Sequence, residues 1–252
     1  MRIRNIFLSE VYKICRSPIL LFHILIPLLG AMIFLSYYSI AGWNEQEKIL
    51  GYLQVVAGVF PIVIAMCETM LVQQEVRAGK YDMLLTVPHR RASVHFVKLT
   101  IVSVLGLCAT LLSMFGFGIL FRKMGNIGLP TLFYGKVAIL LFTSYIPLYM
   151  IQYVICYIGG KGIGLGVGIL GSLLTLLLRT GLGDECWMYF PWGIPIHLSC
   201  RYAYEEMLQI NLWSNPEVKI AWGWLMILVI IMIVFIIIWS KKWEPHVECD
   251  EE

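Results

Sequence analysis

The apolar residues of the chain fall into long blocks separated by short polar connections. A transmembrane helix needs about 20 predominantly apolar residues to cross the roughly 30 Å hydrocarbon core of a bilayer. Blocks of this kind predict six transmembrane helices: 19–40, 50–72, 98–121, 132–158, 163–179 and 220–240. The predicted fold class is therefore an all-α integral membrane protein in which residues 1–252 form a single membrane domain.

A shorter amphipathic pattern precedes the first block. Ile3, Phe7, Val11 and Ile14 recur at helical spacing, with polar residues largely opposite them. The Ser17-Pro18 pair then interrupts the helix. We therefore expect an interfacial helix over about 3–16 that turns into the first span.

The connection before the last span, 180–219, is long. Its segment 187–212 is apolar enough to enter the membrane without crossing it, which predicts re-entrant-like short helices. Cys186 and Cys200, two of the seven cysteines, lie in this connection. They form a disulfide if it faces an oxidising compartment, and otherwise remain two free thiols.

Composition and charge placement support a membrane protein of defined orientation. Hydrophobic residues make up 59% of the 252-residue chain and charged residues 14%, too few for the charged shell of a soluble domain. The net charge of +3 gives no basic stripe of the kind that binds nucleic acid. Lys and Arg gather at both ends of the chain and after the second span, so both termini are predicted to be cytoplasmic.

Proline and glycine mark special positions inside the spans. Pro27, Pro61 and Pro147 each remove a backbone hydrogen bond, so kinks are expected there. Glycine stands at every second position over 160–168, a small-residue pattern that favours close helix packing.

No catalytic, metal-binding or cofactor-binding motif is present. The five histidines lack metal-ligand spacing, and no G-x-x-x-x-G-K-[ST] phosphate loop occurs. Glu68 is the acidic residue well inside a predicted span, and intramembrane carboxylates are functional candidates by default. It either lines a translocation path or is an interfacial carboxylate hydrogen-bonded to water or to Arg77.

The connection after the second span carries a recognisable set of residues. The set, followed by Lys98, is Glu75, Gly79, Leu84, Leu85, Pro88 and Arg91. In this position it resembles the first cytoplasmic loop of ABC transporter permeases of the ABC type 2 exporter class. The leader, the six spans and the long connection before the last span are similar to that architecture over essentially the whole chain.

This resemblance implies roles for the two cytoplasmic segments. The loop 73–97 would include a coupling helix, at about 79–91, that docks on a nucleotide-binding subunit, and 3–16 would be the elbow helix. ATP and Mg²⁺ would be bound by two copies of that ATPase subunit, and this chain would bind no cofactor. A second permease chain, identical or paralogous, would complete the transporter.

Overall similarity favours a narrower relationship. The chain looks most like permease subunits of lantibiotic-immunity transporters, which expel a cationic peptide from the bacterial membrane. An exporter of drugs or other hydrophobic substrates is the alternative, because the same apolar and aromatic residues would line either path. A non-transporting membrane anchor or sensor subunit is the alternative from another class.

Overall fold

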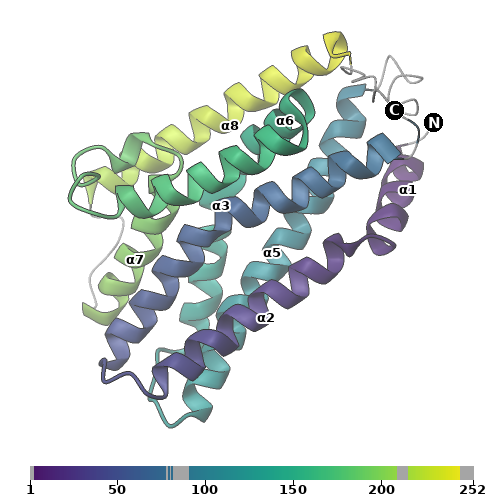
Figure 1. Ribbon diagram of the computed structural model, residues 1–252. Helices are drawn as coiled ribbons and strands as arrows, with labels where there is room; N and C mark the ends of the chain where they lie inside the picture. The colour runs from purple at the N-terminus through teal and green to yellow at the C-terminus, as the bar shows by residue number, and fades with distance from the viewer. Residues whose placement is uncertain (1–2, 78, 80, 82–90, 209–214, 245–252) are drawn as a thin grey trace.

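The computed structural model describes residues 3–77, 79, 81, 91–208 and 215–244, and this part of the chain is all-α. Its elements, in chain order, are α1 (Ile3–Cys15), α2 (Pro18–Tyr38), α3 (Glu45–Arg77), α5 (Arg91–Lys123), α6 (Thr131–Leu178), the short 3-10 helix η2 (Trp187–Tyr189), α7 (Gly193–Leu208) and α8 (Pro216–Lys242). The long helices run side by side as a bundle, and α1 lies across one end of it (Figure 1).

Five of the described helices are long and apolar enough to cross a membrane, namely α2, α3, α5, α6 and α8. The predicted spans 19–40, 50–72, 98–121 and 220–240 each fall within one of them, apart from the frayed end of the first. The predicted spans 132–158 and 163–179 fall together in the 48-residue α6.

The helix α6 is broken at Gly160, whose backbone (φ 68°, ψ −165°) is not helical. Such a positive φ favours glycine, because other residues meet a steric penalty there. The Gln152 amide donates a hydrogen bond to the Gly164 carbonyl at 2.7 Å, although twelve residues of straight helix would separate them by about 18 Å. The two arms of α6, on either side of Gly160, therefore fold back on each other.

Pro61 lies inside α3, where it removes one backbone hydrogen bond of the helix. A proline has no N–H to bond the carbonyl four residues earlier, here that of Ala57. The Tyr145 hydroxyl of α6 donates to this carbonyl, and the Ile62 N–H donates to Ser172 Oγ at 3.1 Å. Both arms of α6 thus supply hydrogen-bond partners for backbone groups of α3 next to its proline.

The second arm of α6 packs against α3 through glycine. A Cβ added at Gly168 would clash with Ala65, and one at Gly164 would clash with Cys156 and crowd Thr69. No atom lies within 4 Å of a Cβ added at Gly162 or Gly166. Among the alternating glycines at 160–168, Gly164 and Gly168 are therefore the two that pack closely against α3, and we call this contact the glycine seam.

The connections differ from expectation in detail. The predicted loop 73–97 is shorter in the structure, because α3 continues to Arg77 and α5 already begins at Arg91. The predicted leader 3–16 is helical as α1. Its buried face, however, is Ile6, Glu10 and Ile14, whereas Ile3 and Phe7 of the predicted apolar face are exposed. Short helices, η2 and α7, precede α8 as predicted.

Candidate functional site

The ends of α3 and α5 that flank residues 78–90 form the region to which the sequence points. Glu75 lies in the last turn of α3 and is buried. Gly79 follows with φ 127°, in the region that favours glycine, and Arg91 begins α5. Leu84, Leu85 and Pro88 lie outside the described residues.

Glu75 belongs to a buried charged cluster built from three helices. The cluster consists of Glu10 and Lys13 of α1, Glu75 of α3 and Lys98 of α5. Lys98 Nζ contacts Glu10 Oε2 and lies 2.7 Å from Glu75 Oε1. Lys13 Nζ lies 2.8 Å from the same Glu75 oxygen and 2.9 Å from Glu10 Oε1. Each ammonium group therefore bridges the same two carboxylates.

Burial makes this cluster energetically sensitive. The Lys98 side chain is 0% exposed, and the side chains of Glu10 and Glu75 are 5% and 4% exposed. Two acids and two bases balance in charge, but removing one partner of a buried ion pair leaves an uncompensated charge, typically at a cost of about 3–5 kcal/mol. The charged cluster therefore fixes α1 to the helix ends on both sides of residues 78–90.

Aromatic side chains surround the same end of the bundle. His95 of α5 is buried, and its Nδ1 lies 2.8 Å from the Tyr153 hydroxyl of α6. The ring of Trp243, just after α8, stands edge-on to Tyr81 at 5.1 Å between centroids. Arg91 donates to the Trp243 carbonyl at 3.3 Å. The start of α5, the first arm of α6 and the C-terminal end of α8 thus meet beside the charged cluster.

The sequence set contains both Glu75 and Lys98, but it does not pair them, and it contains neither Glu10 nor Lys13. Glu10 stands alone among the basic residues of the leader, four residues from both Ile6 and Ile14. That spacing places it on one helix face with two apolar residues. A carboxylate on an apolar helix face predicts that α1 buries a charge in the bundle. A buried carboxylate requires a basic partner.

Glu68 lies in the interior of α3, as the sequence predicts, and is 0% exposed. Neither of its carboxylate oxygens has a hydrogen-bond partner among the described residues. The expected alternative of a bond to Arg77 is therefore not found. Glu68 is within electrostatic reach of Tyr149, Tyr153 and Cys156 of α6, which places it at the α3–α6 interface.

Cys186 and Cys200 are both free thiols, which is the second of the two alternatives that the sequence left open. Cys200 is buried in the apolar core beside Ile196 and Ala203. Cys186 Sγ lies instead 3.7 Å from the Leu182 carbonyl, within its own turn. The two cysteines share a connection in sequence, but the folding of α7 into the bundle separates their surroundings.

Comparison with protein families identifies the chain. Residues 6–170 match the family described as ABC-2 family transporter protein, which is more than half of the sequence. The chain belongs to this family. It is the membrane permease of an ABC-2 transporter and lacks ATPase activity. No curated protein and no solved structure matches the chain.

The matched part of this ABC-2 permease contains the whole charged cluster. It includes α1 from Ile6 onward, the segment 78–90 and α6 beyond its break at Gly160. An ABC permease requires a partner ATPase subunit, since the permease itself does not hydrolyse ATP.

Proposed function

We propose that this ABC-2 permease transmits movement from a separate ATPase through the segment 78–90, and that the transporter expels a lantibiotic or similar antimicrobial peptide from the bacterial membrane. The observation that carries the first part is the charged cluster. It ties α1, α3 and α5 together at the two ends of that segment. A force applied to residues 79–91 therefore acts on three helices at once.

The proposed topology has six crossings. α2, α3, α5 and α8 each cross once, and the two arms of α6 cross separately because the chain reverses at Gly160. An even number of crossings places the N-terminal and C-terminal ends of the chain on the same side. The excess of Lys and Arg at those ends favours the cytoplasm, with α1 as elbow helix and 79–91 as coupling helix.

The proposed assembly contains two permease chains and two ATPase subunits. ATP and Mg²⁺ are bound by the ATPase subunits, which close on binding ATP. Their closure pulls on the coupling segment, and the charged cluster passes the movement to α3 and α5. Glu68 lies about two turns along α3 from Glu75, and we propose that it lines the translocation path.

Co-purification tests the docking part of this proposal. A variant in which Leu84→Asp and Leu85→Asp are combined should lose the ATPase subunit in mild detergent, because two charges would stand where an apolar contact is required. The matched control is Ile127→Asp, at an 85% exposed apolar residue in the connection at the other end of α5. Full retention of the ATPase by the double variant would refute docking at this segment.

Resistance assays test the substrate class. A lantibiotic-sensitive bacterium that expresses the transporter should tolerate higher lantibiotic concentrations than cells without it. The gain should disappear with the Leu84→Asp, Leu85→Asp variant. If the transporter protects instead against hydrophobic drugs, and not against the peptide, the proposed substrate is wrong while the permease role stands.

A further inference from the structure

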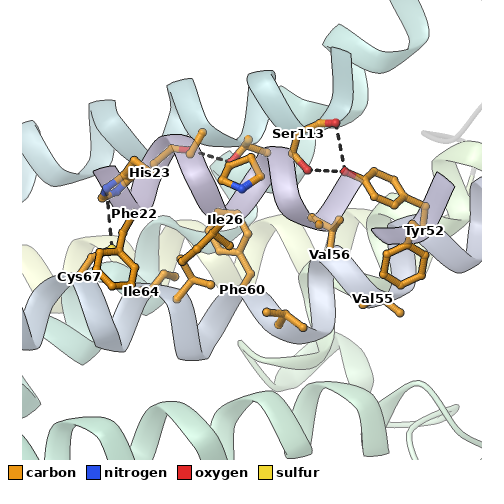
Figure 2. Close-up of a pocket in the computed structure, with 18 of the residues that line it drawn as sticks. Phe22, His23, Ile26, Tyr52, Val55, Val56, Phe60, Ile64, Cys67 and Ser113 are labelled. Carbon is orange, nitrogen blue, oxygen red and sulfur yellow. Dashed lines mark hydrogen bonds between the residues drawn. The ribbon is translucent and has the colours of Figure 1, made fainter. Parts of the chain in front are cut away.

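A narrow apolar slot lies between α2, α3 and α5, away from the charged cluster. Its volume is about 180 Å³, similar to the engineered cavity of roughly 150 Å³ that binds benzene in a well-studied lysozyme. Apolar side chains dominate its lining, among them Phe22, Ile26, Val56 and Phe60 (Figure 2). Nothing in the mechanism proposed above uses this space.

The slot is long for its volume. Its lining on α2 extends from Phe22 to Phe34, and on α3 from Tyr52 to Cys67. At about 1.5 Å per residue these stretches are roughly 18 Å and 22 Å long, which exceeds the roughly 15 Å of one leaflet's hydrocarbon. A volume of about 180 Å³ spread over such a length means that the slot is thin in cross-section. A linear alkyl chain fills the length of that shape, whereas a single compact ring or a folded peptide does not.

Polar groups occur at the two ends of the slot and are already partnered. At one end the Tyr52 hydroxyl bonds Ser113 Oγ at 2.7 Å. At the other end His23 Nδ1 bonds the Ile19 carbonyl at 2.7 Å. The same His23 nitrogen approaches Cys67 Sγ at 3.8 Å (Figure 2). The wall between these ends offers almost no polar group, so it selects an apolar occupant.

The surroundings indicate the source of that occupant. α2 exposes large apolar residues over its length, as expected of a helix in contact with lipid; they include Leu21, Leu25, Leu29 and Ile33. The His23 end of the slot is the end next to α1, which exposes Leu8 and Tyr12, and the basic Arg16 is exposed in the turn directly after α1. The Arg16 guanidinium lies over the Tyr12 ring at 4.2 Å. Such a basic, aromatic interfacial helix attracts anionic lipid headgroups.

We propose that this slot binds one acyl chain of a membrane phospholipid whose anionic headgroup lies against Arg16. The bound chain occupies the space between α2 and α3, where protein side chains leave a gap. Lipid therefore completes the packing of α2 on the bundle. This proposal depends on neither the ATPase partner nor the exported substrate.

The decisive variant fills the slot without disturbing the backbone. Gly30 lines the slot, and a Cβ added there meets no atom within 4 Å. The variant Gly30→Leu should therefore fold and occupy the alkyl space. Gly223→Leu is the matched control, because Gly223 also has nothing within 4 Å and lies in α8, outside the slot. Ala109→Leu fills the same space from α5 and serves as a second variant.

The experiment uses the full chain in vesicles of phosphatidylglycerol and phosphatidylcholine, with a phosphatidylglycerol probe that carries a diazirine on one acyl chain. After illumination, peptide mass spectrometry should find the probe on slot residues of α3 such as Val56 and Phe60. Gly30→Leu and Ala109→Leu should lose this labelling, and Gly223→Leu should keep it. Labelling of α8 measures ordinary surface lipid and should not change in the slot-filling variants, which also verifies that they are folded.

Two results would overturn the proposal. Labelling of Val56 and Phe60 that is equal in Gly30→Leu and in the unaltered protein would show that no chain occupies the slot. Labelling confined to outward-facing residues would show surface lipid only. A phosphatidylcholine probe tests the headgroup: it should label the slot less than the phosphatidylglycerol probe, and Arg16→Gln should abolish that difference. Equal labelling by the two probes in the unaltered protein would refute the role of Arg16.

Discussion

The charged cluster and the glycine seam both attach α3 to its neighbours, but they do so by different physics. The seam joins α3 to α6 by direct backbone approach at Gly164 and Gly168, where no side chain fits between the helices. The charged cluster joins α3 to α1 and α5 through long side chains that can reorient. A seam of this kind holds one geometry, whereas bridging ion pairs can exchange partners during movement.

The difference matches the position of each contact. The cluster lies next to residues 78–90, where we propose that the ATPase acts. The seam lies deeper along α3, near Pro61 and Ala65. We therefore interpret α3 and α6 as a unit that moves together, and the charged cluster as the joint through which it is moved.

The largest effect is expected from Lys98→Ala. This change leaves the buried Glu10 and Glu75 with only the partly exposed Lys13 between them, and should lower the free energy of unfolding by about 3–5 kcal/mol. Thermal unfolding in detergent measures the loss. Combining Lys98→Met with Glu10→Gln and Glu75→Gln removes all three charges and should recover much of the stability. If Lys98→Ala leaves the free energy of unfolding unchanged, the charged cluster does not hold α1, α3 and α5 together.

A smaller effect is expected from Gly168→Leu in the seam. The added side chain has no space against Ala65, and overpacking of this kind typically costs about 1–3 kcal/mol. Gly166→Leu, two residues away in the same helix, meets nothing within 4 Å and should cost less. Unfolding of both variants under one detergent condition gives the comparison, and equal destabilisation would argue against a specific seam at Gly168.

Tyr145→Phe removes the hydroxyl that donates to the Ala57 carbonyl left free by Pro61. Because a buried acceptor loses its partner, we expect a destabilisation of about 1–3 kcal/mol, at the lower end since the aromatic packing stays. In an otherwise identical chain with Pro61→Ala, the alanine restores the N–H that bonds the Ala57 carbonyl, so Tyr145→Phe should then cost less. A penalty that is the same with and without Pro61 would contradict this pairing.

Lys13→Ala should have the smallest effect, about 1 kcal/mol or less, because its side chain is 20% exposed and solvent screens it. Partial burial lowers the pKa of Lys13, but hydrogen bonds and charges from Glu75 and Glu10 outweigh burial and raise its pKa above the ordinary value. With a raised folded-state pKa, its contribution is complete below the ordinary lysine pKa of about 10.4 and is lost only as pH rises through the higher value. The loss of unfolding free energy in Lys13→Ala should therefore be about the same at every pH between roughly 6 and 9. Unfolding of both proteins at several pH values in that range measures it.

Hydropathy and helix punctuation predicted most of the bundle, because both depend on local sequence. The blocks of apolar residues located the long helices, and Ser17-Pro18 marks the start of α2, where Ser17 Oγ accepts the Ile19 N–H at 3.3 Å. The glycine-rich run predicted close packing, although only the structure shows which glycines face α3.

Long-range partners could not be read in the same way. Lys98 meets Glu10 across 88 positions of sequence, and no local pattern relates the two. The apolar periodicity of the leader predicts its buried face only in part: Ile14 is buried, Ile3 and Phe7 are exposed, and Glu10 turns toward Lys98. Cys186 and Cys200 show the converse limit: nearness in sequence does not bring Cys186 to the buried Cys200, and both remain free thiols.

The central claim is that the segment between α3 and α5 faces the cytoplasm, where a separate ATPase can reach it. Single variants Leu84→Cys and Ile127→Cys, treated with a membrane-impermeant maleimide in intact cells and read by peptide mass spectrometry, test it most directly. We predict labelling at position 127 in intact cells, and at position 84 only after the membrane is permeabilised. Labelling of position 84 in intact cells would contradict the topology, the docking site and the coupling role together.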